Sequence, residues 1–206
     1  MEVKIPVFIR GKRNYVQGTQ IIARAAELIA DETFNFHQAS FHQITDKLLM
    51  ISDNADLKES ADFIGEVVFL KGLEKVNLFV IKSSYLAPIR DIPMDMEIKF
   101  VQSIENEIFY SLEKCNDWES LINGIVQVFV IEHKRIFPKA KDIWLTGIRN
   151  TLIPLAVQAK NEKRSLKIKL KRSYKSELNN QTLWEFSLNT PSSSSFDGIT
   201  TFSYKE

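Results

Sequence analysis

The sequence predicts an α+β protein in which an antiparallel sheet wraps around one central helix. The clearest helical segment is residues 19–30, where apolar side chains recur at the spacing of one helix face, namely Ile21, Ile22, Ala25, Leu28 and Ile29. Nearly every other segment has the alternation or the β-branched content typical of strands. Because a single helix among many strands must bury its apolar stripe, we expect the sheet to pack around it.

A polar loop leads into this helix. Arg13, Asn14, Tyr15 and Gln17 precede Gly18, which closes the loop. Thr19 is expected to cap the helix, because its hydroxyl can accept a hydrogen bond from an amide of the first turn.

The first half of the chain is expected to contain six strands or extended segments. They are residues 3–9, 33–44, 66–70, 75–86, 94–100 and 107–114. Residues 47–51 fit either a helical turn or a strand. Residues 52–60 are polar and acidic, which predicts a surface loop.

The second half is expected to alternate helices and strands. Asn116 and Glu119 predict a capping box for a short helix that ends at Asn123-Gly124. The expected elements after it are a strand at 125–132, a basic loop at 133–139, a helix at 142–158 interrupted by Pro154, and strands at 166–171, 182–188 and 199–204.

This order of elements suggests an internal repeat. Residues 3–114 and 125–204 would each run strand, loop, helix and further strands, with Gly18-Thr19 in the place of Gly147-Ile148. Chance similarity between common strand and helix patterns stays open. We therefore expect two units, residues 1–115 and 116–206.

Composition limits the classes of function. The net charge is +1 over 206 residues, so the overall field favours no polyanionic partner. Cys115 is the single cysteine, which excludes an internal disulfide and suits a cytoplasmic protein. We expect no membrane span. The sequence contains no Walker loop, Rossmann fingerprint, zinc-type cysteine pair or Gly-x-Ser-x-Gly elbow, so we expect no cofactor and no metal.

Two stretches resemble hot-dog proteins, in which a long antiparallel sheet wraps around one helix. Residues 15–22 are similar to the glycine-containing entry to that helix. Residues 81–98 are similar to the strand, the apolar-proline segment and the alternating strand that follow it. The resemblance covers residues 3–114 better than residues 125–204. If the repeat is real, the chain would be a double hot-dog.

The resemblance implies an acyl thioester as ligand, carried by coenzyme A or by an acyl carrier protein, in a thioesterase- or dehydratase-like protein. It implies that amides at the helix start bind the thioester carbonyl, which places Gly18 and Thr19 in the site. Arg13, Asn14 and Gln17 are further candidates for substrate binding. A role confined to helix entry is equally open for these loop residues.

His133 and Tyr15 are the catalytic candidates. Histidine titrates near neutral pH, so His133 could act as a base. A surface histidine in a basic loop is the simpler interpretation of the same residue. His37 and His42 are five residues apart, which places them on opposite faces of a strand and disfavours a metal site.

The sequence also departs from the hot-dog dehydratases, which have a histidine before the helix and an acid within it. Residues 3–18 contain no histidine, and the place of the acid falls near Ala23. Catalysis is therefore undecided, and a non-catalytic binding or assembly subunit is the alternative. Whether the chain forms a homo-oligomer also stays open.

A third hypothesis concerns the basic strand face between Lys163 and Lys175, which could attract nucleic acid or an acidic carrier protein. A solvated strand face is the favoured interpretation, because Tyr174 is the only aromatic residue there that could stack on a base.

Overall fold

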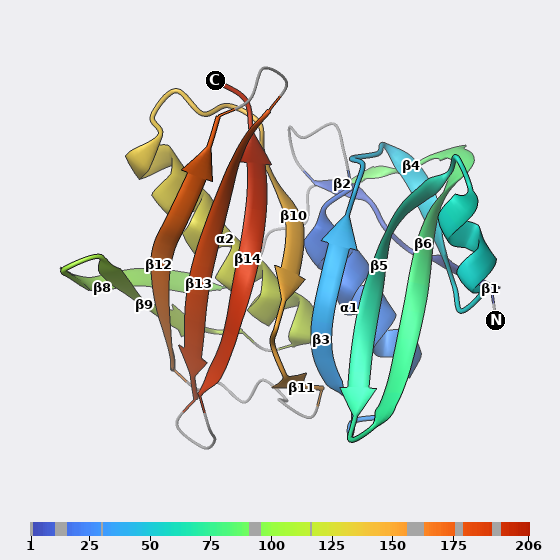
Figure 1. Ribbon diagram of the computed structural model, residues 1–206, viewed down its shortest axis with the longest axis horizontal. Coiled ribbons are helices and arrows are strands. Elements are labelled where there is room, and N and C mark those ends of the chain that lie inside the picture. The colour runs from blue at the N-terminus through green and yellow to red at the C-terminus, as the bar shows by residue number, and fades with distance from the viewer. Residues whose placement is uncertain are drawn as a thin grey trace.

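The computed structural model describes residues 2–10, 16–29, 31–90, 96–115, 117–155, 163–175, 179–190 and 195–206. In this part of the chain, two helices lie against one face of a long antiparallel sheet (Figure 1). The helices are α1 (Gly18–Ile29) and α2 (Trp118–Ile136). The expected α+β class is confirmed, with two α-helices packed on the sheet.

The first half of the sheet has the order β1-β4-β6-β5-β3. Its strands are β1 (Glu2–Ile5), β3 (Asn35–Phe41), β4 (Lys47–Ser52), β5 (Phe63–Lys71) and β6 (Glu74–Leu86). Strand β4 reaches β5 through the short 3-10 helix η1 (Ala55–Glu59), although β6 lies between these two strands in the sheet. A separate parallel pair joins β2 (Ile9–Arg10) to β7 (Ile89–Arg90).

The second half has the order β10-β14-β13-β12-β9-β8. Its strands are β8 (Glu97–Ile104), β9 (Glu107–Glu113), β10 (Ile143–Arg149), β12 (Arg164–Tyr174), β13 (Asn180–Asn189) and β14 (Phe196–Tyr204). Strands β12, β13 and β14 are neighbours both in the sheet and along the chain. The expected strands at 107–114, 166–171, 182–188 and 199–204 are therefore confirmed.

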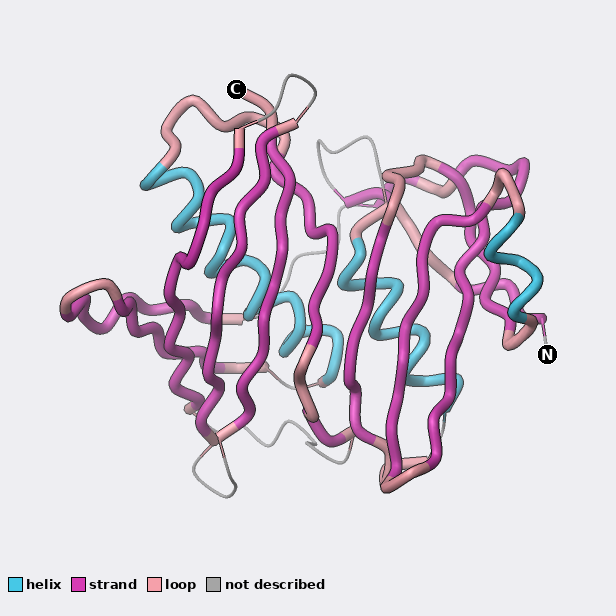
Figure 2. The backbone as a smooth tube through the Cα atoms, viewed as in Figure 1, coloured by secondary structure: helices cyan, strands magenta, loops and turns pink. Residues whose placement is uncertain are grey.

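The two halves join where β3 pairs with β10 and with the short strand β11 (Ile153–Pro154). We call this join the seam. Gly147 and Ile148 of β10 pair with Ser40 and Ala39 of β3, so the two halves form one sheet that is joined over a short stretch of these strands (Figure 2).

Helix α1 lies where the apolar stripe predicts it. Ile21, Ile22 and Ala25 are buried, and the helix packs on β3 and β10. Gln20 lies among them and is also buried. Its side-chain amide accepts a hydrogen bond from the Phe8 N–H at 3.1 Å and donates one to the Phe8 carbonyl oxygen at 2.9 Å. These two bonds attach the helix to the segment that follows β1.

The expected helix break at Asn123-Gly124 and the expected strand at 125–132 are wrong, because α2 runs through both. Asp117 caps this helix and bonds reciprocally with Ser120, in place of the predicted pair Asn116 and Glu119. The buried side chains keep a helical period across the glycine, namely Leu121, Ile122, Ile125, Val128, Phe129, Glu132 and His133. The many β-branched residues gave the segment the composition of a strand, but the period of its buried face is that of a helix.

The prediction of a helix at 142–158 is also wrong over residues 142–155, the part that the structure describes. Residues 143–149 form β10, in which Ile143, Leu145 and Gly147 are buried on alternate positions. Pro154 lies in β11, whose pairing with β3 extends the seam. The proposed match of Gly147-Ile148 with Gly18-Thr19 therefore fails, because one pair lies in a strand and the other begins a helix.

Strands β8 and β9 belong to the second half of the sheet, because β9 pairs with β12 from Arg164 to Ile168. A boundary between residues 115 and 116 would separate these partners. In the sheet, the change from one half to the other falls between Arg90 and Glu97.

Candidate functional site

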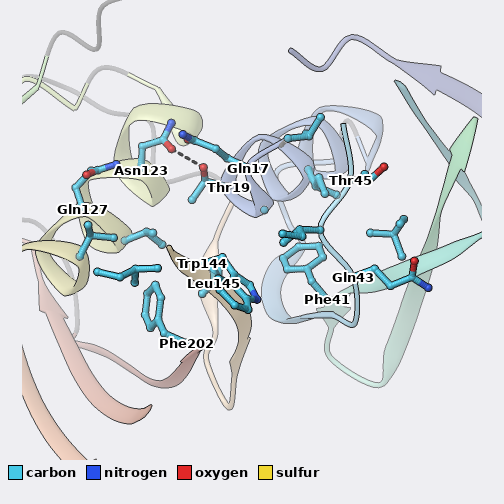
Figure 3. A pocket seen from close by; sticks show the side chains of 18 residues that line it. Gln17, Thr19, Phe41, Gln43, Thr45, Asn123, Gln127, Trp144, Leu145 and Phe202 are labelled. Carbon is cyan, nitrogen blue, oxygen red and sulfur yellow. Dashed lines mark hydrogen bonds between the residues drawn. The ribbon is translucent and has the colours of Figure 1, made fainter. Parts of the chain in front are cut away.

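A pocket lies above the seam, on the helix side of the sheet (Figure 3). Its wall is formed by the first turn of α1, the middle of α2, the start of β10 and the chain that leaves β3. Gly18 and Thr19 come from α1, and Asn123 and Gln127 come from α2. Both halves of the sheet therefore contribute to one pocket.

The α1 part of the wall depends on Gly18. A Cβ atom at this position would lie 2.7 Å from the Phe41 ring and 3.5 Å from Leu145. Because glycine has no Cβ, Phe41 can pack directly against the start of the helix. The apolar part of the wall continues with Val126, Val130 and Phe202.

The polar part of the wall is neutral. Gln17, Thr19 and Asn123 are buried, and Gln127 is half-buried. The Thr19 hydroxyl donates a hydrogen bond to Oδ1 of Asn123 at 2.5 Å. None of the described lining residues is charged or titrates near neutral pH. The described wall therefore offers hydrogen bonds in an apolar surrounding, without a general acid or base.

The pocket has a cavity volume of about 30 Å³ and opens at its rim. This is more than the roughly 10 to 15 Å³ that one water molecule needs on the same measure. It can hold one small polar group, such as a carbonyl oxygen, but not an acyl chain.

The two helices meet side by side at this pocket. Thr19 contacts Asn123, and Arg24 forms an ion pair with Glu119 at 2.9 Å. The later residue of α1, Arg24, contacts the earlier residue of α2, Glu119. The two helices therefore run antiparallel where they touch. The ion pair fixes the second turn of α1 against the first turn of α2.

Three of the predicted substrate-binding residues, Gln17, Gly18 and Thr19, lie together in the pocket wall. Their binding role stays a prediction. Thr19 lies within the first turn of α1 and uses its hydroxyl to contact α2 instead of capping its own helix. Arg13, Asn14 and Tyr15 lie outside the described residues.

His133 lies in α2 and not in a loop between a strand and a helix. It is fully buried, and both ring nitrogens have partners, at 2.7 Å to the Phe129 carbonyl oxygen and at 2.5 Å to the Thr182 hydroxyl. The rings of Trp184 and Phe202 pack around it. Burial lowers the pKa of His133 to about 4. His133 is not part of the pocket wall.

The sequence interpretation missed Asn123 and Gln127. A signal was present, because two amide side chains four residues apart interrupt an otherwise apolar run and would share one face of a helix. Interpreting the run as a strand after a helix break separated the two residues.

The basic strand corresponds to β12, which lies between β9 and β13 and is not an edge strand. Lys167 forms an ion pair with Glu107 at 3.5 Å, and Lys171 forms one with Glu185 at 3.1 Å. A surface depression of about 290 Å³ includes Lys167 and Lys169 but also Glu107, Glu185 and Asp197. Acidic partners therefore offset much of the positive charge that the sequence suggested for this face.

Comparison with known proteins identifies the fold. The chain is similar to a tesB protein from Mycobacterium avium subspecies paratuberculosis, with a TM-score of 0.57 and 11% sequence identity over 97% of this chain and 91% of that chain. It is also similar to a conserved protein of unknown function with a hot-dog fold from Alicyclobacillus acidocaldarius, with a TM-score of 0.57 and 8% identity over 100% of this chain and 92% of that chain. The chain has a hot-dog fold.

A third similar structure is the dehydratase domain from the CurJ module of the curacin polyketide synthase. Its TM-score is 0.54, with 8% identity over 99% of this chain and 90% of that chain. No family model matches the sequence, and no curated protein matches it. Neither described helix combines the length and apolar character needed to cross a bilayer.

Proposed function

We propose that this protein is a double hot-dog that binds an acyl thioester between its two units. Residues 1–90 would form the first unit and residues 96–206 the second, each with one helix. The thioester carbonyl would lie in the pocket at the start of α1. The observation that carries this proposal is the placement of Gln17, Gly18 and Thr19 in a pocket to which α2 also contributes.

The chemistry of the pocket suits a carbonyl group. Amide N–H groups at the start of a helix, together with the helix dipole, favour partial negative charge. The first turn of α1 contains no acidic residue that would oppose this charge. The apolar residues Val126 and Val130 would contact the first carbons of the acyl chain, and the rest of the chain would extend over the exposed rim formed by Gln43 and Ile44.

We propose binding in preference to catalysis. The described wall contains no general acid or base, and His133 lies elsewhere with both ring nitrogens already bonded. Similar hot-dog structures include a tesB protein and a polyketide synthase dehydratase domain, which makes thioester-linked acyl groups the ligand class to test first.

The test uses a panel of acyl-coenzyme A and acyl-pantetheine thioesters of increasing chain length. Binding is measured by calorimetry, and hydrolysis is measured by the release of free thiol. We expect saturable binding of at least one thioester and no thiol release above the uncatalysed rate.

A pair of variants on α2 locates the site. Val126→Phe would fill the pocket and is expected to abolish binding. Ile131→Phe places the same ring on the exposed side of the same helix and is expected to bind like the unaltered protein. Absence of binding across the panel, or unchanged binding by Val126→Phe, would remove the proposal. If the unaltered protein releases free thiol and Val126→Phe abolishes this release, the proposal of binding alone would be replaced by one of catalysis.

A further inference from the structure

The side chain of Asn123 is buried with only one of its two polar ends bonded. The residue is 1% exposed. Its Oδ1 atom accepts the hydrogen bond from Thr19, whereas its Nδ2 atom has no hydrogen-bond partner among the described residues. In Figure 3 the amide and the Thr19 hydroxyl point toward each other at the pocket wall.

Thr19 fixes which end of the amide is available. Its hydroxyl donates to Oδ1, so the amide plane is held with Nδ2 directed away from this bond. The Nδ2 group carries two N–H donors and no acceptor. A ligand atom that pairs with it must therefore be an acceptor, such as a carbonyl oxygen.

A buried NH2 group without a partner is costly, because it loses its hydrogen bonds to water and gains none in return. Leucine has the same number and branching of side-chain heavy atoms and would occupy this position in an apolar helix face without that cost. Asparagine at this position is better explained by a ligand than by packing alone. The neutral wall strengthens such a bond, because no charged group competes for it and the surroundings are apolar.

We propose that Asn123 is the residue that recognises the carbonyl oxygen of the bound acyl group, with Thr19 as the residue that positions it. This inference rests on the proposed function and makes it more specific. The space of about 30 Å³ beside these residues accommodates the oxygen atom. The helix start and Asn123 then approach that oxygen from two different helices, so recognition requires both halves of the protein.

The experiment compares two ligands that differ only at the carbonyl. The first is the acyl-pantetheine thioester that binds best in the panel above, and the second is the matching thioether, in which a methylene replaces the carbonyl. For the unaltered protein we expect the thioester to bind more tightly by roughly 5- to 150-fold, the range expected for one buried hydrogen bond.

Two substitutions of Asn123 test the donor. Asn123→Leu removes it, and Asn123→Asp replaces Nδ2 by an oxygen while keeping an acceptor for Thr19. We expect the ratio of thioester to thioether affinity to fall in both variants by the part that one hydrogen bond contributes, while the helix start retains the remainder. Unfolding in urea is measured alongside, and Asn123→Leu is expected to be at least as stable as the unaltered protein.

Two further comparisons separate recognition from general damage. Thr19→Val removes the positioning hydroxyl and should lower the affinity ratio, whereas Thr19→Ser retains a hydroxyl and should preserve it. Asn77→Asp changes a half-buried asparagine of β6 that does not line the pocket, and should leave the ratio unchanged.

The outcomes distinguish this inference from the proposed function. Equal affinity for thioester and thioether in the unaltered protein would mean that Nδ2 binds only water, which overturns the inference and leaves thioester binding intact. A ratio retained in Asn123→Leu would overturn it equally. If neither ligand binds at all, the proposed function fails and the inference fails with it.

Discussion

The N-terminal ends of α1 and α2 are built differently, although the two helices lie side by side. At α2, Asp117 accepts a hydrogen bond from the Ser120 N–H at 2.6 Å, and Ser120 accepts one from the Asp117 N–H at 3.0 Å. At α1, Gln17, Gly18 and Thr19 line a pocket, and Thr19 bonds to the other helix. The end of α2 satisfies its polar groups within its own turn, so the end of α1 is the better candidate for a ligand.

The same contrast extends to the interiors of the two halves. In the second half, His133 is enclosed by aromatic rings, and the buried Glu132 accepts hydrogen bonds from Tyr110 at 2.6 Å and Arg135 at 2.7 Å. In the first half, His37 is only half-buried and bonds to the Thr151 carbonyl oxygen at 3.0 Å. In the second half, the buried titratable residues His133 and Glu132 therefore form hydrogen bonds within the core.

The largest expected effect is the loss of stability in His133→Ala. Removing a buried ring that packs against Trp184 and bonds to Thr182 should lower the free energy of unfolding by about 3 to 5 kcal/mol. Urea unfolding measures this loss, and His37→Ala should lose much less. Thioester affinity of the folded His133→Ala protein should be unchanged, and a selective loss of ligand binding or turnover would instead restore the catalytic interpretation of His133.

The next effect is a loss of stability in acid. In the unfolded chain His133 takes up a proton near pH 6.5, whereas in the folded protein its pKa is about 4. Between these values the unfolded state binds more protons, so stability falls as the pH is lowered from 6.5 to 4, by about 3 kcal/mol.

Carboxylates also titrate in this range, and a matched variant separates their contribution. His133→Gln keeps polar atoms at this position but does not titrate. The slope of unfolding free energy against pH should be shallower in His133→Gln than in the unaltered protein. Equal slopes would show that protonation of His133 is not linked to folding.

A smaller effect is expected from Asp117→Ala. This change removes the cap of α2 and should lower the free energy of unfolding by about 1 kcal/mol. Because the end of α2 lies outside the pocket wall, the affinity for the thioester should not change. A weaker affinity in Asp117→Ala would contradict the assignment of the ligand site to the end of α1.

The smallest effects come from one glycine in each helix. A Cβ at Gly124 would lie 3.5 Å from Cys115 and 3.6 Å from Leu112, which are ordinary contacts. Gly124→Ala should therefore gain up to about 1 kcal/mol of stability, because alanine favours a helix interior. Gly18→Ala should lose stability, because its Cβ would press on the Phe41 ring. Thermal unfolding of both variants tests the contrast, and a gain in Gly18→Ala would contradict the close packing at the start of α1.

The accuracy of the sequence prediction follows the clarity of each pattern. Helix α1 could be predicted because its large apolar residues, Ile21, Ile22, Leu28 and Ile29, recur at the spacing of one helix face. Strand β6 could be predicted because Leu78 to Ile81 form a continuous buried run between turns. Helix α2 could not be predicted, because it is buried on several sides and its valines and isoleucines give it the composition of a strand.

The candidate site could be predicted only on the α1 side. Gln17, Gly18 and Thr19 are adjacent in sequence, so one local pattern identifies them. Asn123 lies 104 positions away from Thr19 and reaches it only through the packing of two helices. A contact of this kind depends on the placement of α2, which local sequence patterns did not give.

Trp144, on β10, lies half-buried in the pocket wall. Trp184 is completely buried beside His133, and Trp118 packs edge-on against Phe36. The chain thus carries a fluorophore at the site where a ligand would displace solvent, and two others in surroundings that the ligand would not reach. The intrinsic fluorescence emission should shift to shorter wavelength when a ligand binds. A Trp144→Phe protein should show no such shift.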